Sequence, residues 1–151
     1  MPVRPTSLVM LVSLGVLVGA GCGGDSSKVW DRASVEDYVQ ARAVWNGGQA
    51  KLRGELEGCV VLQAFSSCRL GLSERLRLLD ADIERRLSTL AARDDLDDHC
   101  RDIVHDSAKT FSSDQPSLTA KTVSTLTEQI TISSLPGTAA MSAIWKACQP
   151  S

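Results

Sequence analysis

The side chains best able to bind a metal ion or transfer a proton are concentrated in one short stretch of the chain. The stretch holds two histidines among several aspartates: Asp94, Asp95, Asp97, Asp98, His99, Asp102, His105 and Asp106. If it is helical, four of these residues fall within one arc of the helix surface: Asp95, His99, Asp102 and Asp106. A carboxylate and an imidazole one helical turn apart can share a divalent metal, as in some helical bundles.

The same arc is opposite the apolar face of its helix, so we expect it to point into solvent. One exposed helix face makes no pocket, and the helix dipole alone favours acidic residues in a first turn. We therefore interpret the cluster as a solvated face, favour no metal site and expect no cofactor. A metal-dependent or acid–base function is an alternative that would use His99, Asp102 and Asp106.

The beginning of the chain has the pattern of an export signal. A basic start at Arg4 is followed by a mostly apolar run over residues 8–18. This run is shorter than the roughly 20 apolar residues that span a bilayer. The pattern therefore predicts a cleaved secretory signal, not a permanent membrane helix.

The run ends in Leu17-Val18-Gly19-Ala20-Gly21-Cys22, which resembles the lipobox of bacterial lipoprotein precursors. The resemblance implies that the Cys22 thiol is diacylglycerated, that cleavage falls just before it, and that its lipids anchor the protein to a membrane. The anchor would lie on the outer side of the cytoplasmic membrane or in the outer membrane. The alternative is cleavage after Ala20 by an ordinary signal peptidase, which would give a secreted soluble protein.

Composition and length limit the mature protein further. The chain has 151 residues, with 16 basic and 18 acidic side chains. Loss of residues 1–21 removes Arg4 and no acid, which leaves 15 basic against 18 acidic residues. Without a basic excess we expect no nucleic-acid partner. We predict a signal peptide (1–21), a lipidated N-terminus with a flexible tether (22–29) and a single helical domain (30–151).

Apolar residues recur at helical spacing through most of this domain, and no stretch alternates for long enough to predict a sheet. The first predicted helix is capped by Ser34, with Asp37 as a capping-box partner, and is stopped by residues 46–48. A second helical segment covers 52–60, and a bend or turn is expected between 66 and 72.

The clearest periodicity follows this bend and predicts a seam like those of helical bundles. The seam consists of Leu72, Leu76, Leu79, Ile83, Leu87 and Leu90. The outer face of the same helix is expected to carry Glu74, Arg75, Arg77, Asp80, Asp82, Arg85 and Arg86. We interpret these charges as a solvated face with i,i+3 and i,i+4 ion pairs, in preference to an arginine-rich binding surface.

Asp94 or Asp95 is expected to cap the next helix, over 96–111. The remaining predicted elements are a loop over 112–117, a helix over 118–132, a turn at 136–137 and a closing helix over 141–148. Many β-branched residues weaken the helical pattern of the segment that follows the loop. The chain as a whole predicts an all-α fold, a small bundle of four to six helices held by disulfides.

The chain has five cysteines, and assigning Cys22 to the lipid leaves four for disulfides: Cys59, Cys68, Cys100 and Cys148. An exported chain permits disulfides, and four cysteines allow three pairings. If the helices on either side of residues 94–95 are antiparallel, Cys68 lies about 30 Å from Cys100, which is too far for a disulfide. We prefer Cys59–Cys68 with Cys100–Cys148, which needs a helix break near residues 66–67. Cys59–Cys100 with Cys68–Cys148 is the alternative.

The sequence contains no serine elbow, no phosphate-binding loop and no His-Glu-x-x-His motif. The tryptophans are interpreted as packing residues: Trp30, Trp45 and Trp145. We therefore expect a non-enzymatic binding or structural module, held at a membrane by Cys22, that contacts another protein of the bacterial envelope. One alternative is an inhibitor or immunity-type protein acting on an envelope hydrolase. The other is the metal-dependent function described above.

Overall fold

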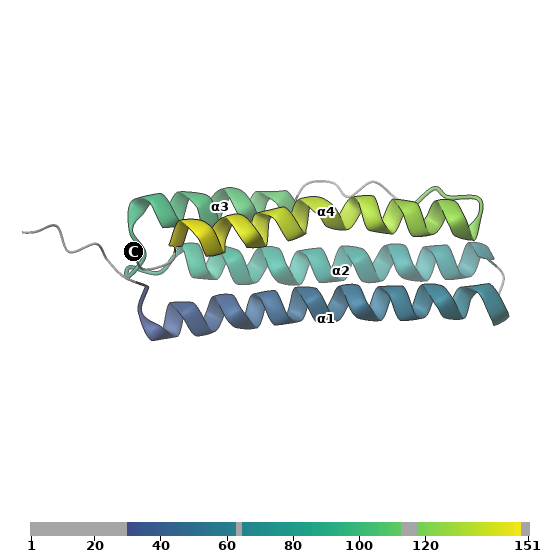
Figure 1. The fold of residues 1–151 in the computed structure, drawn as a ribbon, viewed down its shortest axis with the longest axis horizontal. Helices are drawn as coiled ribbons and strands as arrows, with labels where there is room; N and C mark the ends of the chain where they lie inside the picture. The colour runs from purple at the N-terminus through teal and green to yellow at the C-terminus, as the bar shows by residue number, and fades with distance from the viewer. Residues whose placement is uncertain (1–29, 63–64, 113–117, 149–151) are drawn as a thin grey trace, which may run out of the picture.

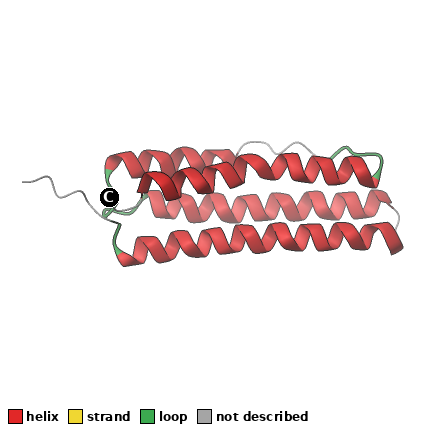
Figure 2. Cartoon of the chain, in the orientation of Figure 1, coloured by secondary structure: helices red, strands yellow, loops and turns green. Residues whose placement is uncertain are grey.

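The computed structural model describes residues 30–62, 65–112 and 118–148, so the predicted export signal, the predicted tether and Cys22 lie outside the described residues. Within these ranges, four helices run up, down, up and down along one elongated bundle (Figure 1): α1 (Arg32–Leu62), α2 (Phe65–Ala91), α3 (Asp98–Ser112) and α4 (Val123–Cys148). The described residues contain no strand (Figure 2), which confirms the predicted all-α bundle. The bundle end where α1 begins and α4 ends is called the terminal end below, and the opposite end is called the distal end.

Two aspartates that were not predicted as caps begin α1 and α3. Asp31 accepts a hydrogen bond from the backbone N–H of Ser34 at 2.7 Å, and Asp97 accepts one at 2.7 Å from the first turn of α3. The predicted caps, Ser34 and Asp94 or Asp95, are therefore wrong. Instead, the Ser34 hydroxyl donates to the Asp95 carboxylate at 2.5 Å, across the terminal end of the bundle.

Two predicted interruptions lie inside continuous helices. α1 runs through Gly47 and Gly48, and α4 runs through Pro136 and Gly137. Glycine and proline disfavour helix interiors, but tertiary packing overrides that preference here. A Cβ added at Gly137 would lie 2.7 Å from Cζ2 of Trp45, so only glycine lets α4 approach this ring so closely.

The α1–α2 break comes earlier than predicted, because α1 ends at Leu62 and α2 already begins at Phe65. The described helices contain no break between residues 66 and 72. The two disulfides nevertheless follow the preferred pairing, with Cα–Cα distances of 5.8 Å for Cys59–Cys68 and 5.1 Å for Cys100–Cys148. The first joins α1 to α2 at the distal end, and the second joins α3 to α4 at the terminal end.

The long helix α4 is rich in threonine and serine, and their hydroxyl groups bond to its own backbone. Thr127 donates to the backbone carbonyl of Val123 at 2.9 Å, and Thr131 donates to that of Thr127 at 2.8 Å. Such bonds to the preceding turn satisfy the hydroxyls within the helix. The predicted helix over 118–132 is thus confirmed in type, but it begins only at Val123.

α3 is much shorter than the other helices, with 15 residues against 26 to 31. At about 1.5 Å per residue it is roughly 22 Å long, so it covers only the terminal half of the bundle (Figure 1). In the distal half, buried Leu118 and Ala120 pack into the core in its place. Gln129 fastens this segment, because its Oε1 accepts the backbone N–H groups of Thr119 and Ala120 at 3.1 and 3.0 Å.

The buried apolar residues form two clusters with a polar level between them. The terminal cluster includes Tyr38, Trp45, Ile83, Leu87, Val104, Phe111 and Ile144. The distal cluster includes Leu52, Leu56, Leu72, Leu76, Leu126 and Ile130. Between them, α1 contributes buried Gln49, α2 contributes buried Asp80 and α4 contributes buried Ser134. We call this polar level the waist of the bundle.

The leucine seam of α2 is confirmed, but the predicted position of Asp80 is wrong. Asp80 was assigned to the outer face, yet only 2% of its surface is exposed. It follows Leu76 by four residues and precedes Ile83 by three, so it falls on the seam itself. The spacing of the apolar residues was identified correctly, but one buried position of the seam holds the charged residue Asp80.

None of the helices in the described residues is long and apolar enough to cross a membrane.

Gly47→Ala is expected to raise the free energy of unfolding by about 0.5–1 kcal/mol, because alanine costs less entropy in a helix than glycine. An added methyl group at Gly47 meets no atom within 4 Å. Gly48→Ala is the matched control, since its Cβ would lie 2.5 Å from Cδ1 of Leu79. Urea unfolding should find Gly47→Ala more stable than Gly48→Ala. Equal stabilities would contradict the close approach of α1 and α2 at Gly48.

Candidate functional site

The arc considered as an alternative metal site does not come together as one in the described residues. His99, Asp102 and Asp106 are exposed on α3, as expected of a solvated face. Asp95, the fourth member of the arc, precedes α3 and bonds to Ser34. Within the described ranges, no group of three or more His, Cys, Asp and Glu side chains is placed to hold a metal ion. Lys109 lies 2.9 Å from Asp106, and this hydrogen bond lowers the pKa of the Asp106 carboxyl.

Asp95 belongs instead to an ion-pair network centred on Arg93. The Arg93 guanidinium lies 2.9 Å from Asp95, 2.9 Å from Asp37 and 3.4 Å from Asp31. Asp37 is therefore an ion-pair partner of Arg93, in place of its predicted capping role. Burial raises the pKa of Asp95, but the hydrogen bonds from Ser34 and Arg93 outweigh it and bring this pKa to about 2. The network ties the start of α1 to the α2–α3 connection.

The tryptophans pack as predicted, and one of them, Trp45, also lines a cavity. The buried indole of Trp30 donates to Sγ of Cys100 at 2.7 Å. Trp145 is partly exposed and stacks on Tyr38 with ring centroids 5.7 Å apart. Trp45 is buried and meets Phe111 edge-to-face, with centroids 5.2 Å apart. This last pair forms a wall of the cavity described next.

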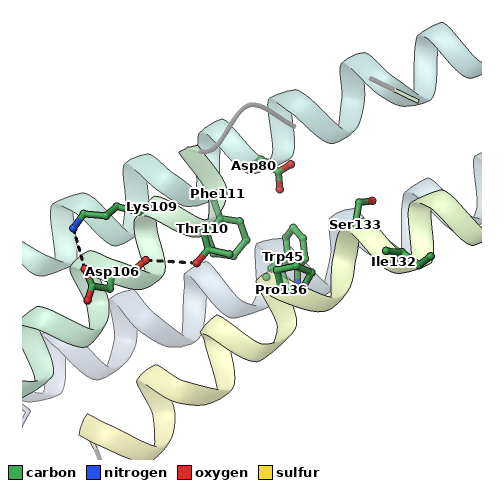
Figure 3. Close-up of a pocket in the computed structure, with 10 residues that line it drawn as sticks. Trp45, Asp80, Asp106, Lys109, Thr110, Phe111, Ile132, Ser133 and Pro136 are labelled. Atoms are coloured by element: carbon green, nitrogen blue, oxygen red, sulfur yellow. Dashed lines mark hydrogen bonds and ion pairs between the residues drawn. The ribbon is translucent and has the colours of Figure 1, made fainter. Parts of the chain in front are cut away.

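A cavity of about 510 Å³ opens into the waist at the point where α3 ends (Figure 3). Its volume is within the range of small-molecule sites. All four helices contribute to its lining: Trp45 from α1; Asp80 from α2; Asp106, Lys109, Thr110 and Phe111 from α3; and Ile132, Ser133, Pro136 and Gly137 from α4. The exposed Lys109–Asp106 ion pair lies at the mouth, whereas Trp45 and Asp80 are buried.

The carboxylate of Asp80 points toward this space (Figure 3). Neither of its oxygen atoms has a hydrogen-bond partner among the described residues. Because burial disfavours the charged form, the pKa of Asp80 is raised to about 7. A buried carboxyl group with a raised pKa in a cavity is a common property of functional sites. The sequence signal that could have identified it is its seam position, four residues after Leu76.

Comparisons with protein-family models, with curated proteins and with solved structures find no match to this chain. Function is therefore inferred from the geometry of the site.

Proposed function

We propose that the protein is a lipid-anchored component of the bacterial envelope, attached through Cys22, whose helical domain binds another envelope protein. The export signal and the resemblance of the segment before Cys22 to a lipobox support the anchor. Trp30, the first described residue, follows Cys22 by only eight positions. The terminal end of the bundle would therefore lie close to the membrane.

The observation that carries the binding role is an open cavity with exposed apolar side chains beside it. Ile132 lines the cavity and is 57% exposed, and Leu135 on the same helix is 60% exposed. Large apolar side chains next to a concave site are typical of interaction surfaces. In this proposal the partner protein covers the face of α4 around the cavity.

Photocrosslinking in intact cells tests the binding role. A photoreactive residue at position 132 should form a covalent adduct with one envelope protein. The control is the same residue in place of Leu70, which is 64% exposed on α2 and does not line the cavity. Identical adducts at the two positions, or none at either, would contradict a partner surface on α4.

The anchor is tested by the intact mass of the mature protein from membranes. We expect the mature protein to begin at Cys22 and to carry acyl chains there. The Cys22→Ser variant should be absent from the membrane fraction. An unmodified soluble protein that begins at Gly21 would overturn the lipid anchor. It would leave the crosslinking result interpretable, because the helical domain is unchanged.

A further inference from the structure

The waist cavity contains a carboxyl group that no other group in the described bundle pairs with. Asp80 is 98% buried by the fold and lines the cavity, yet both of its carboxylate oxygens lack a hydrogen-bond partner in the described ranges. Burying an unpaired carboxylate is unfavourable unless a cation or hydrogen-bond donors compensate it. The Gln49 amide, which is also buried at the waist, has no partner in the described ranges either and does not donate to Asp80. The described bundle therefore supplies this carboxyl group with neither a cation nor a donor.

The remaining lining favours a positively charged group. The other charged residues of the lining, Asp106 and Lys109, pair with each other at 2.9 Å. Neither α1 nor α4 contributes a charged side chain to the lining. With Asp80 ionised, the cavity thus carries one net negative charge, which a monovalent cation would balance.

The walls favour an organic cation over a hydrated metal ion. Trp45 and Phe111 line the cavity with aromatic surface, which binds alkyl chains and attracts ammonium groups. Ser133 adds a hydroxyl oxygen that can accept a hydrogen bond. Pro136 has no N–H, so the carbonyl of Ile132 lacks the donor that a helix usually supplies four residues later. These groups suit an ammonium head with several N–H donors on a short apolar stem.

We propose that the waist cavity binds an organic cation, with its ammonium group beside Asp80 and its apolar stem against Trp45 and Phe111. This goes beyond the proposed function, since it concerns the interior of the cavity and holds whether or not a protein covers α4. The same chemistry is supplied by a small free amine and by a lysine side chain of a polypeptide.

Binding of n-hexylamine to the purified protein at pH 8 tests the proposal by isothermal titration calorimetry, with the Trp45 indole resonance as a local readout. The neutral analogue 1-hexanol should bind about tenfold more weakly or worse, because it cannot neutralise Asp80. Asp80→Asn should abolish this preference. Asp82→Asn is the matched control and should keep it, since Asp82 pairs with Arg85 and Arg86 and does not line the cavity.

A lysine-containing tripeptide and its side-chain-acetylated form identify the source of the ammonium. Binding of the unmodified tripeptide alone assigns a polypeptide ligand, and binding of hexylamine without the tripeptide assigns a small amine. Equal affinity for hexylamine and hexanol in the wild type would overturn the proposal even if Asp80→Asn failed to fold. So would an unshifted Trp45 resonance. Neither result would bear on the crosslinking at position 132, so failure of the cation site and failure of the protein contact are separable.

Discussion

Asp80→Asn is expected to be more stable than the wild type at pH 8, by up to about 4 kcal/mol in the free energy of unfolding. Burial raises the pKa of Asp80 to about 7 in the folded state, against roughly 3.9 in an unfolded chain. Between these values the folded state holds a proton that the unfolded state has released. The wild type therefore loses stability as the pH rises from about 4 to about 7, whereas asparagine does not titrate.

Urea unfolding at pH 4, 6 and 8 measures this difference, and Asp82→Asn supplies a control of opposite sign. The hydrogen bond from Arg86, with that from Arg85, lowers the pKa of Asp82 below its ordinary value. The charged form of Asp82 therefore stabilises the folded state at pH values above the pKa of an ordinary aspartate. Asp82→Asn should be less stable than the wild type at pH 8. Parallel pH profiles for the wild type and Asp80→Asn would contradict a buried, unpaired carboxylate at the waist.

Removal of the Cys100–Cys148 disulfide by a double alanine substitution is expected to lower the free energy of unfolding by about 4 kcal/mol. Removal of Cys59–Cys68 should cost only about 2.5 kcal/mol. The difference arises because the first bridge closes a loop with a sequence separation of 48 and the second closes one of only 9. A longer loop restricts the unfolded chain more.

The two double variants are matched controls for each other, since each removes two sulfurs from the same bundle. Urea unfolding under non-reducing conditions should rank the wild type first, the Cys59/Cys68 variant second and the Cys100/Cys148 variant last. Cys100 also accepts the indole N–H of buried Trp30, and its loss adds to the cost. The reverse order of the two variants would contradict the pairing of Cys100 with Cys148, which closes the longer loop.

The sequence was sufficient to predict the fold class, the α2 seam and the disulfide pairing. Each of these depends on periodicity or on distances along regular helices. The interruptions expected at Gly47 and at Pro136 were wrong for one reason, which is that local preference was taken to decide the ends of helices. In the folded chain, Gly48 and Gly137 are positions of close helix approach, which only the packed bundle defines.

The candidate site was less accessible from sequence than the fold. Three candidates from the conspicuous cluster, His99, Asp102 and Asp106, are exposed on α3. Asp95 precedes this helix and pairs with Ser34 and Arg93 instead. The cavity instead joins Trp45, Asp80, Phe111 and Pro136 from four different helices. No spacing rule connects these positions, and Asp80 was assigned to the outer face because a charged residue is rarely expected on an apolar seam.

If Cys22 holds the protein to a membrane, the network around Arg93 would also resist mechanical force on the chain. A partner that pulled the domain outward would load the chain at Trp30, the first described residue. From there the force would pass at once to α3 through Cys100, to α4 through the disulfide, and to the α2–α3 connection through Arg93. Four elements would share the tension in parallel, so α1 would not peel away alone.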